Sequence, residues 1–247
     1  MDRLIYVAMT GAAHTLSQQA ATAHNLANAA TTGYRAETNV FRAVPVFGDA
    51  LQTRTFVIDS TAGANLAAGP IQRTGRDLDV AVQGPGWIAV RMADGSEAYT
   101  RNGSLQIGPN GILQTRDGLS VQGDGGVIST PPDSRITIAR DGTVSVVPTG
   151  LKPSTVAAVG RIKLVNPADT RLTKGENGLF RLRDGGEAAP DSNVALIGGA
   201  LEGSNVNVVQ EMVTMIALSR QFELQMRMLQ NAENNSREAS QILGPRG

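Results

Sequence analysis

The side chains that most often carry enzyme chemistry are scarce in this chain. Its 247 residues include no Cys, which excludes thiol nucleophiles, Cys-ligated zinc and disulfides. The two His residues, His14 and His24, stand ten positions apart in one predicted helix, about 15 Å along its axis. One copy of the chain therefore cannot bring both to a single metal ion, and no His elsewhere can act as a general base. This pattern argues against a hydrolase.

Short motifs that resemble chemical sites have simpler explanations here. Gly84-Pro85-Gly86 lacks the third glycine and the following helix of a dinucleotide-binding loop, so it predicts a tight turn. Asp77 and Asp79 could act as paired carboxylates or calcium ligands on one face of a strand. Arg73 and Arg76 lie close by, however, and indicate an ordinary solvated charge cluster. We therefore predict no catalytic residue, no cofactor and no metal site.

Charge and hydropathy narrow the class of partner. Lys and Arg together number 22, as do Asp and Glu, so no net charge attracts nucleic acid. Aromatic residues make up 4% of the chain, which leaves few ring surfaces on which sugars or bases could stack. The apolar stretch at residues 4–9 is too short for a membrane span or a signal-peptide core. We expect a soluble protein with no nucleic-acid partner and no membrane insertion, and export by a signal-independent route stays open.

The two ends of the chain are predicted to form long helices, over residues 1–32 and 205–247. Apolar or small residues recur every three or four positions from Ile5 to Ala30, and Gly33 stands where a left-handed helix cap would be needed. The second helix is expected at residues 207–242, roughly 54 Å long. Its apolar heptad positions are Val208, Met215, Phe222, Leu229 and Leu243 in one series, and Met212 and Met226 in the other.

Between the helices the sequence predicts a β domain at residues 75–186, flanked by an extended connector at 33–74 and a return connector at 187–204. Short β-branched runs alternate there with turn signals, as in an antiparallel domain of many short strands. The expected strands are Leu78–Val82, Trp87–Met92, Leu105–Ile107, Ile136–Ile138, Val144–Val147, Ile162–Val165 and Leu179–Leu182. Eight dipeptides typical of positive φ mark the turns: Asp94-Gly95, Asn102-Gly103, Asn110-Gly111, Asp117-Gly118, Asp124-Gly125, Asp141-Gly142, Asn177-Gly178 and Asp184-Gly185.

The predicted helices are too long to bury their apolar faces on this β domain. A domain of about 110 residues has a radius of gyration of roughly 13 Å, whereas the helices span roughly 40 and 54 Å. Pairing covers only one side of each helix, and positions such as Val7, Val209 and Val213 broaden the apolar faces further. The expected fold is α+β, with terminal helices paired in a coiled-coil-like assembly domain and a central antiparallel β domain.

Four separate motifs along the chain carry a family resemblance. Residues 23–35 contain Asn-Leu-Ala-Asn followed by Thr-Thr-Gly and an aromatic residue; residues 78–87, residues 99–103 with 111–115, and residues 202–206 with 211–213 follow in order. Together these motifs resemble those of the flagellar basal-body rod protein family, and of its proximal-rod members most closely. His24 stands where Asn is commoner, and Trp87 stands where Phe is typical.

The resemblance implies a non-enzymatic subunit of the flagellar rod in the periplasm, exported unfolded by the flagellar type III apparatus. Its implied partners are the other proximal and distal rod proteins and further copies of itself, with the paired helices forming an inner tube. The implied assembly interface, with Gly33 as the connector turn, comprises Leu4, Ile5, Met9, Leu16, Asn25, Leu26, Asn28, Val208, Met212, Met215, Phe222, Met226 and Leu229. The alternative is a secreted β-rich adhesin or carbohydrate-binding module, which would need exposed aromatic or metal-binding sites on the β domain.

Overall fold

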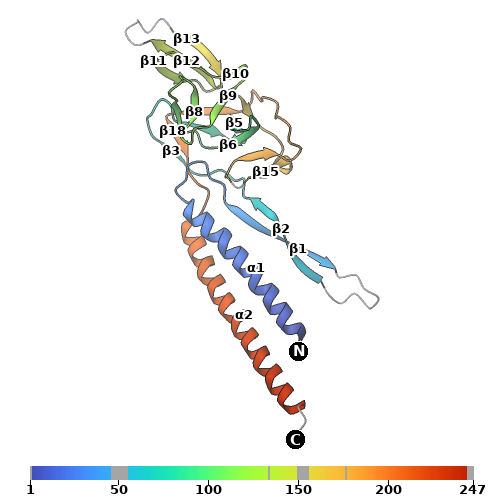
Figure 1. The fold of residues 1–247 in the computed structure, drawn as a ribbon. Helices are drawn as coiled ribbons and strands as arrows, with labels where there is room; N and C mark the ends of the chain where they lie inside the picture. Colours follow the sequence, from blue (N-terminus) through green and yellow to red (C-terminus); the bar gives the residue numbers. More distant parts are fainter. Residues whose placement is uncertain (1, 46–54, 133, 149–155, 176, 244–247) are drawn as a thin grey trace. The chain divides into compact units, whose positions relative to one another are not determined.

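The computed structural model describes residues 2–45, 55–132, 134–148, 156–175 and 177–243. The chain divides into two compact units (Figure 1). The helical unit comprises residues 1–27, 37–63 and 207–247, and the β unit comprises residues 28–36 and 64–206. The chain therefore passes from one unit to the other four times, after residues 27, 36, 63 and 206.

The helical unit is built from two antiparallel helices and a β-hairpin. Helix α1 spans Asp2–Ala27 and helix α2 spans Val208–Leu243, one residue from the predicted limits of the second helix. They lie side by side in Figure 1, and Asn25 near the end of α1 contacts Glu211 near the start of α2. Strands β1 (Glu37–Pro45) and β2 (Thr55–Ala64) pair with each other. Part of the predicted extended connector at 33–74 thus forms strands of nine and ten residues, and residues 46–54 lie outside the described residues.

Helix α1 ends five residues earlier than the sequence pattern predicted. A turn follows Ala27, in which the Thr31 amide donates to the Asn28 carbonyl at 3.1 Å. Gly33 has the expected positive φ of 69°, but it does not cap α1. Its N–H instead donates to the Glu202 carbonyl at 2.7 Å, so a contact within the β unit decides its conformation. The small residues Ala29 and Ala30 continue the helical pattern in the sequence, and a partner as distant as Glu202 cannot be read from that local pattern.

The β unit is antiparallel at each of its strand pairs. Its largest sheet has the order β15-β16-β6-β5-β9-β8-β7, with β10 paired to β9 and β14 paired to β5. Smaller sheets are β11-β12-β13, β17-β4 and β18-β3. The strands are β3 (Ile71–Arg73), β4 (Val80–Gln83), β5 (Trp87–Arg91), β6 (Glu97–Thr100), β7 (Leu105–Ile107), β8 (Leu113–Thr115), β9 (Ser120–Gly123), β10 (Gly126–Val127), β11 (Ser134–Ile138), β12 (Thr143–Pro148), β13 (Ala157–Arg161), β14 (Leu164–Val165), β15 (Leu172–Lys174), β16 (Phe180–Leu182), β17 (Ala195–Gly198) and β18 (Ala200–Glu202).

Strand β5 lies in the centre of the β unit and is buried on both faces. Alternate residues of a strand point to opposite faces of its sheet. Ile88 and Val90 therefore enter the larger apolar cluster, while Trp87 and Ala89 enter a second cluster with Phe180. The Trp87 and Phe180 rings lie 4.5 Å apart between centroids. Each of the seven predicted strands overlaps a strand of the structure, because short apolar runs bounded by turns are local signals.

Six of the eight predicted turn glycines have positive φ, and two do not. Gly103 is required for a different reason, since a Cβ there would overlap the Val80 carbonyl oxygen. At the other position, the positive φ of 114° falls on Gly126 rather than on Gly125. The dipeptide pattern locates a turn, but it does not decide which glycine takes the left-handed conformation.

Candidate assembly interface

On its α1 side, the contact between α1 and α2 is made of small and polar residues. Five described residues of α1 are buried, each at most 7% exposed: Ala8, Ala12, Thr15, Thr22 and Asn25. The Thr15 hydroxyl donates to Gln225 Oε1 at 3.0 Å, and Gln19 Nε2 donates to Ser219 Oγ at 3.3 Å. A Cβ on Gly11 would lie 3.1 Å from Gln225 Nε2, so the helices approach closely here. We call this contact the seam.

The seam does not use the large side chains of the predicted stripe on α1. Of that stripe, Met9 and Leu16 are 53% and 50% exposed in the subunit. The close approach of the helices selects small side chains such as the buried Ala12 rather than large ones. The large side chains at Met9 and Leu16 are displaced to the flank of the seam.

On α2, one predicted heptad series faces the seam and the other does not. Met215, Phe222 and Leu229 are half-buried, on the same side as the buried Leu218. Met212 and Met226, expected as the second series, are 49% and 40% exposed. The second series lies one residue earlier, at Glu211, Leu218, Gln225 and Ala232. Because three of these four residues are polar or small, apolar periodicity alone did not find them.

Large apolar side chains gather on the outside of the helical pair. Among the described residues, twelve of the sixteen exposed large hydrophobic side chains belong to α1 or α2. Five of them lie within the first nine residues of α2. Val208 belongs to the heptad series of Met215 on the seam side, whereas the other four follow a face directed away from the seam. We call this face the outer stripe; it consists of Val209 (70% exposed), Met212 (49%), Val213 (57%) and Ile216 (56%).

The predicted interface residues therefore fall into three groups. Met9, Leu16, Val208, Met212 and Met226 are exposed, whereas Asn25 is buried. The half-buried group contains Ile5, Leu26, Asn28, Met215, Phe222 and Leu229, and the Leu4 side chain lies outside the described residues.

The predicted interface omitted three residues of the outer stripe. Val209, Val213 and Ile216 stand at positions i, i+4 and i+7, which is a helical face visible in the sequence. The sequence marks Val209 and Val213 as positions that broaden the apolar face of this helix, and the heptad positions include Met212 of the same stripe.

Asn25 joins three elements of the helical unit. Its Oδ1 accepts the Glu37 amide at 2.7 Å, and its Nδ2 donates to the Glu37 carbonyl at 3.0 Å and to Glu211 Oε1 at 3.2 Å. The side chain thus continues the hydrogen bonding of β1 while it holds α2. His24 Nδ1 lies 3.1 Å from Glu37 Oε2, and the His14 ring packs edge-on against Phe41, so both histidines contact the same strand.

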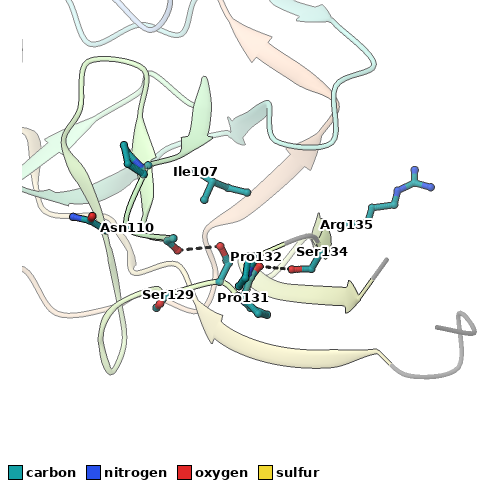
Figure 2. Close-up of a pocket in the computed structure, with 11 residues that line it drawn as sticks. Ile107, Asn110, Ser129, Pro131, Pro132, Ser134 and Arg135 are labelled. Carbon is teal, nitrogen blue, oxygen red and sulfur yellow. Dashed lines mark hydrogen bonds between the residues drawn. The ribbon is translucent and has the colours of Figure 1, made fainter. Parts of the chain in front are cut away.

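A groove of about 900 Å³ on the β unit bears on the adhesin alternative (Figure 2). Ile107 from β7 and the Pro131-Pro132 pair lie along it, and the Ser134 hydroxyl donates to the Pro131 carbonyl at 2.5 Å. Among the described residues, its lining contains no aromatic side chain and a single charged one, Arg135. Sugar-binding sites rely on aromatic stacking, so this groove does not favour a carbohydrate-binding module.

Two further features were sought among the described residues, a cluster of metal-binding side chains and a helix able to cross a membrane. Within residues 2–45, 55–132, 134–148, 156–175 and 177–243, no three His, Asp or Glu side chains converge as metal ligands. Neither α1 nor α2 combines the length and the hydropathy that crossing a bilayer requires.

Comparison with known proteins agrees with this architecture segment by segment. Three family models match: "Flagella basal body rod protein" at residues 5–35, "Flagellar hook protein FlgE/F/G D1 domain" at 81–146, and "Flagellar basal body rod FlgEFG protein C-terminal" at 197–242. The first and third fall mainly on α1 and α2, and the second falls on the β unit.

Full-length relatives carry the same description. The chain is 49% identical to the flagellar basal-body rod protein FlgF of Salmonella typhimurium, covering 98% of this chain and 99% of the relative. It is 48% identical to FlgF of Escherichia coli over the same shares, and 30% identical to the rod protein FlgG of Buchnera aphidicola subsp. Schizaphis graminum over 89% and 91%. These matches, with the rod-family models at both ends, establish that the chain is a structural component of the flagellar basal body, not an enzyme, and belongs to the flagellar basal-body rod protein family.

Proposed function

We propose that this protein polymerises helically with other rod proteins through its paired terminal helices, which form a coiled-coil-like assembly domain. The polymer is the periplasmic drive shaft between motor and hook. Its neighbours are proximal and distal rod proteins and further copies of the same chain. The flagellar type III apparatus exports the subunit unfolded.

The observation that carries this proposal is the outer stripe. A soluble monomer rarely exposes large apolar side chains in a contiguous group unless they bind something. Val209, Val213 and Ile216 are each more than half exposed although they occupy one face of a regular helix. This face points away from the α1–α2 seam, so α1 does not cover it, and the proposed partner is another subunit. Burying one such side chain stabilises a contact by about 1.5–3 kcal/mol.

Val213→Glu tests the proposal without disturbing the folded monomer. Val213 is 57% exposed, so a carboxylate there stays hydrated in the free subunit. At a subunit contact the same carboxylate loses several kcal/mol through desolvation, repeated in each copy. In a strain lacking the wild-type gene, we expect the variant to be exported normally but to be absent from purified basal bodies, with loss of motility.

Val156→Glu is the matched control, because Val156 is equally exposed at 57% but lies in the β unit. This variant should enter basal bodies and restore motility. If the Val213→Glu strain swims as well as the control strain, the outer stripe is not an assembly surface. If its subunit fails to leave the cytoplasm, the stripe acts in export rather than in assembly.

A further inference from the structure

The chain crosses between its two units four times, and the β-unit ends of these four crossings lie in three short segments. Residues 28–36 lie between the first two crossings, residues 64–69 follow the third, and residues 202–206 precede the fourth. These segments are far apart in sequence, yet they are linked by hydrogen bonds that converge on two side chains. Those side chains are Glu202 and Asn205.

Glu202 holds the first two segments to the third. Its carbonyl accepts the Gly33 amide at 2.7 Å, and its Oε1 accepts Arg35 Nη2 at 2.7 Å and the Gly69 amide at 2.8 Å. Its Oε2 accepts Arg101 Nη1 at 3.1 Å. The residue is 1% exposed, so water cannot replace these partners.

Asn205 repeats the arrangement three residues later. Its Oδ1 accepts the Ala36 amide at 2.7 Å, while its Nδ2 donates to the carbonyls of Asn65 at 2.8 Å and Ala67 at 2.9 Å. The Asn65 amide in turn donates to the Ala36 carbonyl at 2.8 Å. Each of the three segments is therefore bonded to both of the others.

The charges at this point make the arrangement cooperative. Arg35 is 1% exposed and Arg101 is 4% exposed, and Glu202 is the carboxylate that both guanidinium groups contact. The Trp87 ring lies 5.9 Å and 5.3 Å from the two guanidinium carbons and covers them. Burial lowers the pKa of Arg101, and the Glu202 carboxylate opposes that shift. Releasing Glu202 would leave two buried cations facing each other, so partial opening is disfavoured.

We propose that Glu202 and Asn205 form a node that locks the three connecting segments to the β unit as one cooperative piece. The segments close or open together, and they do so without unfolding the sheet behind them. The node thereby holds the β-unit ends of all four crossings together, and it does so independently of any motion of the helical unit.

Asn205→Asp in the full-length protein tests the node. The carboxylate keeps the acceptor for the Ala36 amide but has no N–H for the Asn65 and Ala67 carbonyls. Amide hydrogen exchange should become at least tenfold faster at Ala36 and Asn65. A node further requires faster exchange at Gly33 and Gly69, whose amides Asn205 does not touch. Amides of β5 should exchange at the wild-type rate.

Asn207→Asp is the matched control two residues away. Asn207 Oδ1 accepts the Gln210 amide at 3.2 Å at the start of α2, and a carboxylate accepts it equally well. This variant should leave exchange in the three segments unchanged. Glu202→Gln, which removes the charge at constant size, should open the same set of amides as Asn205→Asp.

Two outcomes overturn the proposal. If Asn205→Asp accelerates exchange only at the amides near its own bonds, the two side chains make independent contacts and no node exists. If the β5 amides accelerate to the same degree as Gly33, the segments open only by unfolding of the whole β unit.

Discussion

Asn25 and the backbone of Glu37 close a ring of two hydrogen bonds, with the Glu37 amide 2.7 Å from Asn25 Oδ1 and the Glu37 carbonyl 3.0 Å from Nδ2. The ring attaches the first residue of β1 to the last turns of α1. Since Nδ2 also reaches Glu211, one amide side chain couples the hairpin to both helices. Asn25 is 3% exposed, so these bonds hold the subunit together internally.

Replacement of Asn25 by Asp should loosen the helical unit. The carboxylate loses both donated bonds and stands beside the Glu211 carboxylate, which predicts a loss of about 1–3 kcal/mol in the free energy of unfolding. Urea unfolding followed by helical circular dichroism measures it. Asn231→Asp, an exposed change on α2, is the control. Equal stability of the two variants would show that the Asn25 bonds contribute nothing measurable.

Gly33→Ala should destabilise the β unit more than Gly75→Ala does. Both glycines have a similar positive φ, 69° and 72°, so both variants carry the left-handed strain of about 1 kcal/mol. A Cβ on Gly33 would also overlap the backbone between Arg101 and Asn102, whereas a Cβ on Gly75 meets nothing within 4 Å. Thermal unfolding of the two variants isolates the steric term. If Gly33→Ala is as stable as Gly75→Ala, the predicted steric overlap at Gly33 is wrong. Gly33→Val should be less stable than Gly33→Ala.

Phe222→Asp should unfold the helical pair itself. The ring is half-buried on the seam side of α2, so a carboxylate there should lower the stability of the monomer by about 1–3 kcal/mol. Leu224→Asp, at a side chain 58% exposed on the same helix, should have little effect in the dilute monomer. Helical circular dichroism against temperature compares them. Equal melting curves would mean that Phe222 is free for a neighbouring subunit, as the heptad pattern first suggested.

The turn at Asp141 should weaken in acid. The Thr143 hydroxyl and amide donate to its carboxylate at 2.7 and 3.1 Å, and these bonds hold the pKa of Asp141 below the ordinary 3.8. A lowered folded pKa stabilises the fold fully above pH 3.8, and the stabilisation is lost as the pH falls through the folded value. Carboxyl NMR should give a midpoint below 3.8 in the wild type. The midpoint should rise in Thr143→Val, and a midpoint unchanged by that substitution would contradict this cause.

Local patterns in the sequence predicted the elements of this protein well. Apolar periodicity located α2 to within one residue, and short β-branched runs located the seven predicted strands. Motifs such as Asn25–Asn28 with Gly33 identified the rod family before any contact was known. Each of these signals comes from residues that are close together in the chain, so it can be recognised without knowledge of the tertiary structure.

The faces of the helices and the roles of the motif residues were decided by tertiary structure. Periodicity shows which side chains are apolar but not which neighbour covers them, so it placed Met212 where Glu211 faces the seam. Gly33 could be recognised as left-handed, yet its partner Glu202 stands 169 positions away. Contacts over such distances form only once the strands between them have paired. The sequence therefore determined the elements and the family, whereas the residues of the seam, the exposure of the outer stripe and the node at Glu202 and Asn205 depend on which distant part of the chain each side chain meets.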